Sequence, residues 1–137
     1  MKIKIEGLEA VIAELNDIKD PQQLERNLGK ACLLVETEAK RKAPKGNGAL
    51  RNSITSKVDG NEGIIYTPLE YAPYVEFGTG LFAESGNGRK DVPWVYQDDA
   101  GEWHSTSGMK PQPFLRPALL ENRNKILRII GEGLLDD

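Results

Sequence analysis

The sequence predicts an α+β protein in which an antiparallel β-sheet made of two hairpins packs against a long α-helix in the N-terminal half. Three observations support this class. Apolar residues between 21 and 43 recur at three- and four-residue steps, which is the period of one helix face. Between 54 and 104 the pattern changes to alternation and turn residues, and no strand–helix–strand repeat is present. The length of 137 residues predicts a single domain, 1–137.

Residues 1–43 are expected to be helical. A short amphipathic helix is predicted over 8–18, where five apolar residues share one face: Leu8, Val11, Ile12, Leu15 and Ile18. A second helix begins at Asp20, a candidate cap, with Pro21 in the first helical position. It ends at Ala43, because Pro44 disfavours helical backbone in the residue before it. Its apolar stripe contains Leu24, Leu28, Ala31, Cys32, Val35 and Ala39.

Residues 44–116 are expected to be rich in strands. Alternating residues from Ile54 to Val58 precede turn residues at 59–63, and the chain returns through Ile64–Tyr66. A second hairpin is predicted from Trp94 and Tyr96, a turn at 98–101, and Trp103 on the returning strand.

The segment between the hairpins is predicted in two parts. Residues 71–77 are expected to form a short helical turn or strand, with four residues buried: Tyr71, Tyr74, Val75 and Phe77. Residues 80–92 contain three glycines and are expected to form a mobile loop. A C-terminal helix is predicted over 117–131, starting at Pro117, and residues 132–137 are expected to be a frayed tail.

The composition excludes several classes of protein. The 18 Lys and Arg against 21 Asp and Glu give a net charge of −3, so the chain as a whole does not attract nucleic acid or an anionic membrane. A single cysteine excludes an internal disulfide and favours a reducing compartment. No secretion signal is expected at the N-terminus, and no apolar stretch approaches the ~20 residues of a membrane span.

No pattern of an active site, a metal site or a cofactor motif is present. The single imidazole, His104, stands in a polar hairpin, and Cys32 on the helix stripe is interpreted as a small core residue. Asp98 and Asp99 are interpreted as solvated turn charges. The glycines at 86 and 88 lack the spacing of a phosphate-binding loop. The sequence therefore predicts neither an enzyme nor a binder of metals, cofactors or small molecules.

The clearest charged feature is a run of cations from 40 to 57 with no Asp or Glu between them. The basic segment is defined by its first five members, which are the candidate interface or channel residues: Lys40, Arg41, Lys42, Lys45 and Arg51. One interpretation is a solvated helix end whose charges complement the helix dipole. The other is a surface that faces phosphates or an acidic partner.

Three segments read together resemble a known family. They are RKAPKGNGALRNSI at 41–54, YAPYVEFGTG at 71–80 and KPQPFLRPAL at 110–119. In this order and spacing they are similar to the tailed-phage proteins named after gene product ten of phage HK-97. Residues 81–104 depart from the shorter members of that family, so nothing is carried over to them.

The resemblance implies a structural virion protein of the neck, where the DNA-filled head joins the tail. It implies a homo-oligomeric ring, made in the host cytoplasm, with other head–tail connector and tail proteins as partners and packaged DNA nearby. It implies no catalytic residues. A tail-completion or terminator role stays open, and so does a small nucleic-acid-binding or nuclease accessory protein.

Glu76 and Arg116 are predicted to form a buried or half-buried ion pair. Glu76 stands between Val75 and Phe77, and Arg116 stands between Leu115 and Pro117, so both charges are drawn toward apolar surroundings. The competing interpretation is that these motifs simply build the core, with Tyr71, Tyr74, Phe77, Phe114 and Leu115 forming the contact between sheet and helix.

Overall fold

A computed structural model describes residues 1–5, 21–46, 48–60, 62–86, 88–98 and 100–133. The chain divides into two compact units. Met1–Pro68 and Phe114–Asp137 form one, which we call the helix–sheet unit. Leu69–Pro113 form the other, which we call the hairpin unit. The predicted helix over 8–18 lies outside the described residues.

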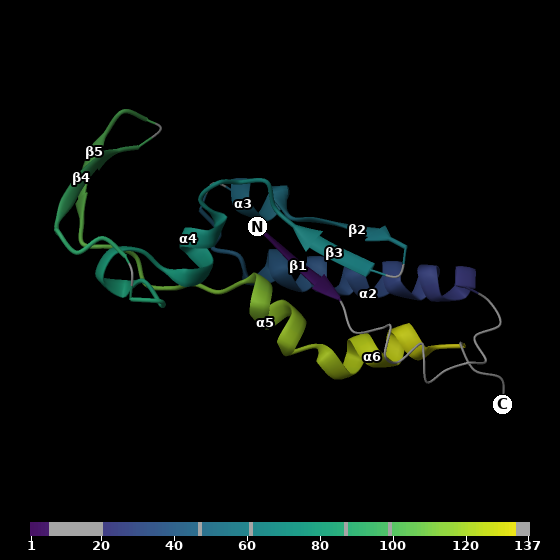
Figure 1. Ribbon diagram of the computed structural model, residues 1–137. Helices are drawn as coiled ribbons and strands as arrows, with labels where there is room; N and C mark the ends of the chain where they lie inside the picture. Colours follow the sequence, from purple (N-terminus) through teal and green to yellow (C-terminus); the bar gives the residue numbers. More distant parts are fainter. Residues whose placement is uncertain (6–20, 47, 61, 87, 99, 134–137) are drawn as a thin grey trace. The chain divides into compact units, whose positions relative to one another are not determined.

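The helix–sheet unit consists of a three-stranded antiparallel sheet with helices on one face (Figure 1). The strand order is β1-β3-β2, with β1 at Lys2–Ile5, β2 at Thr55–Asp59 and β3 at Glu62–Tyr66. Helix α2 (Pro21–Lys42) packs against β2 and β3, and α3 (Ala49–Ser53) leads into β2. The long helix and the first hairpin are thus confirmed, whereas β1 and α3 were not expected.

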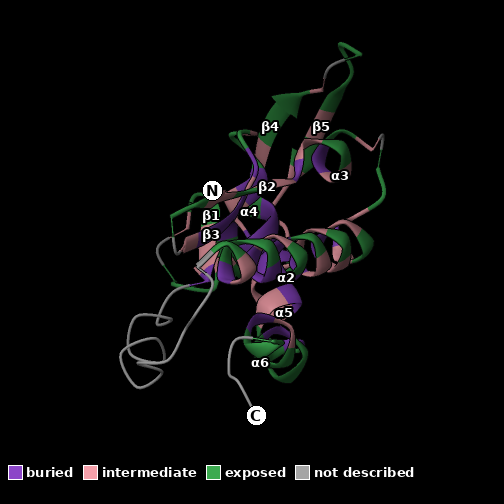
Figure 2. Ribbon diagram, turned by 90° about the vertical axis from the view of Figure 1, so that its right-hand side faces the viewer, coloured by how far each residue is buried: buried purple, intermediate pink, exposed green. Residues whose placement is uncertain are grey.

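The core of this unit forms where α2 meets the sheet and the C-terminal helices. Figure 2 shows the buried residues concentrated along one side of α2 and in the neighbouring elements. The fully covered side chains include Leu28, Val35, Ile54, Ile65, Phe114 and Leu115. Burial of such side chains is the main source of stability in a unit of this kind.

The single C-terminal helix predicted over 117–131 is corrected to two helices. Helix α5 spans Leu115–Leu120 and α6 spans Arg123–Gly131. The break falls at Asn122, whose side-chain amide donates to the Ala118 carbonyl at 2.9 Å. In a continuous helix the backbone N–H of Asn122 would take that carbonyl. It bonds to the Leu119 carbonyl at 3.3 Å instead, so the last turn tightens and α5 ends.

Asn27 joins α2 to the end of α6. Its side chain is completely buried, and its amide nitrogen donates to the carbonyls of Ile130 at 3.1 Å and Glu132 at 2.6 Å. Its amide oxygen accepts from Gln23 at 2.8 Å. Carbonyls at a helix C-terminus have no partner within their own helix, so a side chain from α2 satisfies the end of α6.

The hairpin unit contains two short helical segments and one hairpin. These are α4 (Ala72–Phe77), the 3₁₀ turn η1 (Gly80–Phe82), β4 (Trp94–Gln97) and β5 (Trp103–Thr106). The N–H groups of Thr79 and Leu81 donate to the carbonyls of Met109 and Ser107 at 2.9 and 3.0 Å, which fixes the start of the predicted 80–92 loop. The mobility of that loop stays a prediction.

The second hairpin is confirmed, but it does not join the sheet of the first. β4 and β5 pair with each other as a separate two-stranded sheet. Neither strand contains a buried residue, and Figure 2 shows both in the colours of exposed and intermediate residues. The expected alternation therefore does not mark a buried face in either strand. The α+β class is confirmed, with two sheets in place of one.

The expected burial of Tyr71, Tyr74 and Phe77 is wrong, because all three are exposed. Residues 72–77 are helical, so burial follows a helical period: Ala72, Val75 and Glu76 share the covered face. Tyr74 and Phe77 lie on the other face. Of the five residues expected to build the sheet-to-helix contact, only Phe114 and Leu115 are buried.

Candidate functional site

The basic segment is partly neutralised by carboxylates of the helix–sheet unit. Lys40 lies 3.7 Å from Glu36, Arg41 lies 2.7 Å from Glu38, and Lys42 lies 2.5 Å from Glu121. The Arg41 guanidinium also holds the pKa of Glu38 below its usual value, through a hydrogen bond to the carboxylate. These three carboxylates lie outside residues 40–57. The basic segment therefore carries less unpaired positive charge than its sequence suggests.

The remaining two members of the basic segment, Lys45 and Arg51, lie after the end of α2. Lys45 is exposed in the connection after α2. Arg51 is half-buried on α3, and its Nε atom is buried without a hydrogen-bond partner among the described residues. The role of the segment as an interface or channel surface stays a prediction.

Glu76 and Arg116 lie in different units. Glu76 is completely buried on α4 of the hairpin unit, as expected for a carboxylate drawn toward apolar neighbours. Arg116 is half-buried on α5 of the helix–sheet unit. Their pairing stays a prediction.

The hairpin unit carries an apolar groove beside α4. The groove has a volume of about 990 Å³, and its walls include Tyr74, Phe77, Ala83 and Trp94. Arg89 lines it as well, with its guanidinium carbon 5.1 Å from the centre of the Trp94 ring. Gly78 and Gly80 adopt positive φ values of 82° and 60°, and a Cβ at either position would collide with backbone around Ser107–Met109.

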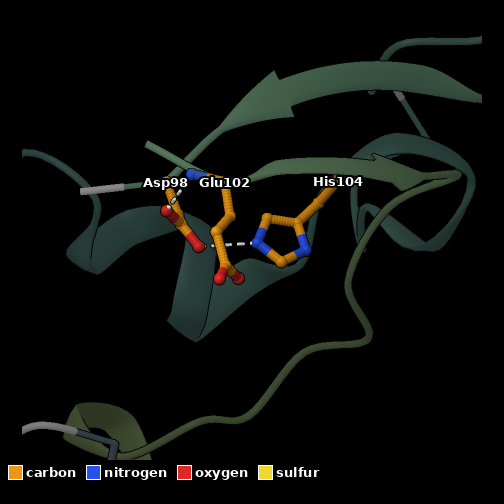
Figure 3. Close-up of side chains that lie close together, drawn as sticks. All are labelled: Asp98, Glu102 and His104. Atoms are coloured by element: carbon orange, nitrogen blue, oxygen red, sulfur yellow. Dashed lines mark hydrogen bonds and ion pairs between the residues drawn. The ribbon is translucent and has the colours of Figure 1, made fainter. Parts of the chain in front are cut away.

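A cluster of three polar side chains lies at the tip of the second hairpin (Figure 3). Asp98, Glu102 and His104 place their ligand-type atoms within 4.8 Å of one another. Asp98 Oδ2 lies 2.6 Å from His104 Nε2, and the Tyr96 ring stacks on His104 with centroids 5.3 Å apart. The N–H groups of Ala100 and Glu102 donate to Asp98 Oδ1 at 2.9 and 2.8 Å.

These hydrogen bonds account for the geometry of the cluster. The pKa of Asp98 is held below its usual value mainly by the hydrogen bond to His104 and, to a smaller extent, by the hydrogen bond from the Glu102 N–H. Two carboxylates and one imidazole also form a donor set that Zn²⁺ or Mn²⁺ accepts in proteins. The cluster is exposed at the hairpin tip, and the turn itself needs Asp98 as an acceptor.

Sequence reasoning missed this cluster because it treated Asp98 and Asp99 as a pair. The useful signal was Gly101, whose φ of 83° lets Asp98 and Glu102 close a three-residue loop. In that register Asp98 lies opposite Glu102, and Glu102 and His104 point to the same face because they are two residues apart.

Cys32 is confirmed as a core residue. Its side chain is buried on α2, and burial raises the pKa of the thiol to about 11. A thiol with a raised pKa holds little thiolate at neutral pH, which argues against a nucleophilic role.

The sheet face opposite α2 is basic. A Cβ at Gly63 would overlap Cys32 Sγ, so Gly63 faces α2 and its neighbours Ile64 and Glu62 face away. Lys4 and Lys57 flank Ile64 in the register, and Lys2 lies opposite Tyr66. A hollow of about 480 Å³ opens there, lined by Met1, Lys2, Lys57, Ile64, Tyr66 and Thr67.

The comparisons with known proteins indicate a structural protein of a bacteriophage tail. A family model described as "Bacteriophage HK97-gp10, putative tail-component" matches residues 8–78, which is 71 of the 137 residues. The match includes α2, the basic segment and α4, and it ends before β4. No curated protein and no solved structure matches the chain. No helix in the described part of the chain is long and apolar enough to cross a membrane.

Proposed function

Because the chain belongs to the HK97-gp10-like family of phage tail components, we propose that it is a structural subunit that assembles into a ring at the neck, where head and tail join. In this role it acts through surfaces that contact other subunits, without catalysis. Its partners are further copies of itself and the neighbouring connector and tail proteins, and packaged DNA passes close by.

The observation that carries this proposal is the exposed apolar surface of the hairpin unit. Of the 11 large hydrophobic side chains found exposed in the described residues, the hairpin unit holds Tyr71, Tyr74, Phe77, Leu81, Phe82, Val95, Tyr96 and Trp103. Monomeric proteins rarely leave so many large apolar groups together in water, and such surfaces mark sites of association. Aromatic residues of this kind are also enriched in protein interfaces.

A nucleic-acid-binding accessory role is the second candidate, and the ion pairs of the basic segment count against it. Lys40, Arg41 and Lys42 already have carboxylate partners. Binding to duplex DNA through phosphates needs several free cations, so the charge that remains on Lys45 and Arg51 is small for that task. A tail-completion role would use the same apolar surface and differs only in the ring that the chain contacts.

The experiment is sedimentation equilibrium of the full chain over a wide concentration range, with and without duplex DNA. We expect the mean mass to rise with protein concentration and to be unaffected by DNA. The variant is Leu81→Ser in the hairpin unit, and the matched control is Leu33→Ser on α2, since both leucines are 58% exposed. Only Leu81→Ser should weaken the association.

A monomer at every concentration would contradict the ring. If that monomer bound duplex DNA with an affinity that depends strongly on salt, the nucleic-acid-binding accessory role would be favoured over the ring.

A further inference from the structure

Among the residues that the structure describes, no other element covers the two strands of the second hairpin. β4 and β5 contain no buried residue, and Tyr96, which shares a hairpin face with His104 and Glu102, is 45% exposed. An isolated two-stranded hairpin is at best marginally stable in water, and burial against another surface is the usual remedy. The apolar residues of this hairpin are therefore suited to a contact outside the unit.

The hairpin also carries more acidic than basic residues. Residues 94–106 contain Asp98, Asp99 and Glu102 and no Lys or Arg. Figure 3 shows Asp98 and Glu102 at the tip, where Asp98 is fixed by its bonds to the turn and to His104. Glu102 is exposed, and its hydrogen bonds to Asp98 are made by its backbone, whose N–H donates to the Asp98 carboxylate and whose carbonyl accepts from the Asp98 N–H.

The basic face of the helix–sheet unit has the opposite character. Lys2 and Lys57 are exposed at the hollow lined by Ile64 and Tyr66, and Lys57 Nζ lies 5.7 Å from the centre of the Tyr66 ring. Lys4, by contrast, lies 3.7 Å from Glu62 on its own sheet. The face thus combines apolar side chains with two cations, in a chain whose net charge is −3.

We infer that the acidic hairpin of one copy docks on the basic sheet face of the next copy, with Glu102 against Lys57. The inference rests on the proposed ring, whose subunits would meet through two different surfaces. A contact between unlike surfaces of identical chains closes into a ring when the rotation between copies allows it. The complementary charges set the register of the contact, and the apolar groups beside them, Tyr96 on the hairpin and Ile64 and Tyr66 on the sheet face, exclude water.

The test exchanges the charges in the full chain and follows self-association by sedimentation equilibrium. Lys57→Glu and Glu102→Lys should each weaken self-association about tenfold or more, because each brings like charges together. A mixture of the two variants should assemble again, since each then offers the other an opposite charge at both contacts. The double variant Lys57→Glu/Glu102→Lys in one chain should assemble for the same reason.

Two controls separate this contact from an effect of total charge. Lys30→Glu and Glu25→Lys change the same charges at exposed positions of α2 and should shift association less than about twofold. The thermal unfolding of every variant is measured, so that loss of fold is not mistaken for loss of contact.

The outcomes distinguish the inference from the proposed ring. If the wild-type chain associates but the mixture and the double variant stay as weak as the single variants, the hairpin–sheet contact is wrong and the ring stands. If Lys57→Glu abolishes binding to duplex DNA and leaves self-association unchanged, the basic sheet face binds DNA phosphates and not a second copy, and the inference is overturned. A wild-type chain that stays monomeric overturns both.

Discussion

Gly63 on β3 and Cys32 on α2 lie so close that a Cβ at position 63 would overlap the cysteine sulfur. The same Cβ would lie 3.4 Å from Leu28 Cδ1. The helix therefore packs closely on the sheet where the strand has no side chain, and the Cys32 side chain fills the space above Gly63.

We predict that Gly63→Ala lowers the free energy of unfolding by about 1–3 kcal/mol, because the added methyl overpacks the contact. Cys32→Ala makes room for that methyl, so the double variant should lose less than the sum of the two single variants. Urea unfolding measures the free energy of unfolding of the two single variants and of the double variant. As a matched control, Gly29→Ala on α2 has ordinary space, with Val58 Cγ2 at 4.0 Å, and should stabilise by about 0.5–1 kcal/mol. Additive losses would show that the two residues do not share the space.

The buried thiol should react slowly with alkylating reagents. Burial raises the pKa of Cys32 from 9.0 to about 11, so the native chain holds little thiolate at pH 8, and the sulfur is covered as well. Iodoacetamide should label the unfolded chain in urea much faster than the native chain, as followed by mass spectrometry. Because the unfolded thiol ionises first, the stabilising contribution of the protonated thiol is lost as the pH rises from about 9 to about 11. Equal labelling rates in the two states would contradict this account.

The pKa of Asp98 should depend on His104. The hydrogen bond from His104 holds that pKa below its usual value, so His104→Ala should raise it toward the ordinary value in a carbon-13 NMR titration. Asp91 is the internal control, because its pKa is held low by Arg89 and should not move. Since the folded pKa is depressed, the contribution of Asp98 to stability is present above the usual Asp range and is lost as the pH falls through the folded pKa. An unchanged pKa of Asp98 in the His104→Ala variant would show that the backbone N–H groups of the turn, and not His104, lower it.

Glu76 and Arg116 should be energetically coupled. Glu76 is completely buried, and a buried carboxylate that loses a charged partner destabilises a fold by about 3–5 kcal/mol. We predict that Glu76→Gln and Arg116→Ala each destabilise by up to that amount and that the double change loses less than their sum. Glu70→Gln, at an exposed position of the same unit, should have little effect. Strict additivity in thermal unfolding would assign Glu76 a different partner.

The basic segment should affect assembly and leave folding intact. Replacing Lys40, Arg41, Lys42, Lys45 and Arg51 by Gln removes charges from residues that are exposed or half-buried, so the fold should survive. If the segment faces an acidic neighbour or the DNA channel, particles that carry the variant should fail to join heads to tails, as counted by electron microscopy and infectivity. Replacing Lys45 and Arg51 alone should have most of the effect, because the other three already have carboxylate partners. Normal particle yields would rule out this role.

The periodic parts of the fold could be predicted from sequence, and the parts set by distant contacts could not. The stripe from Leu24 to Ala39 and the alternation around Ile54–Tyr66 are local patterns, and both elements are present. Strand β1 pairs with β3 across some sixty residues. The alternation of Lys and Ile over Lys2–Ile5 is a local strand signal, but it is only four residues long and does not indicate the distant partner strand. The break at Asn122 depends on one side-chain hydrogen bond to Ala118, which a helical pattern of apolar residues does not reveal.

The same distinction applies to the candidate surfaces. Glu76 was correctly expected to be buried, but what buries it is the helical face that it shares with Ala72 and Val75, since its apolar neighbour Phe77 is exposed. Tyr74 and Phe77 were wrongly expected to be buried, because their exposure depends on the helical face that they occupy and large aromatic residues usually lie inside. The basic segment looked unopposed in sequence because Glu36, Glu38 and Glu121 reach it only through a helix turn and a tertiary contact.

The buried amide of Asn27 has a consequence for the order of events during synthesis. Its two carbonyl partners, Ile130 and Glu132, lie 103 and 105 positions later in the chain. While the ribosome is still translating the hairpin unit, α2 exists without the groups that satisfy this side chain. The helix–sheet unit therefore reaches its final packing only after both hairpins have left the ribosome, and contacts so distant in sequence are slow to form. Nascent chains stalled before residue 130 should expose the Asn27 face of α2 to chaperones and proteases.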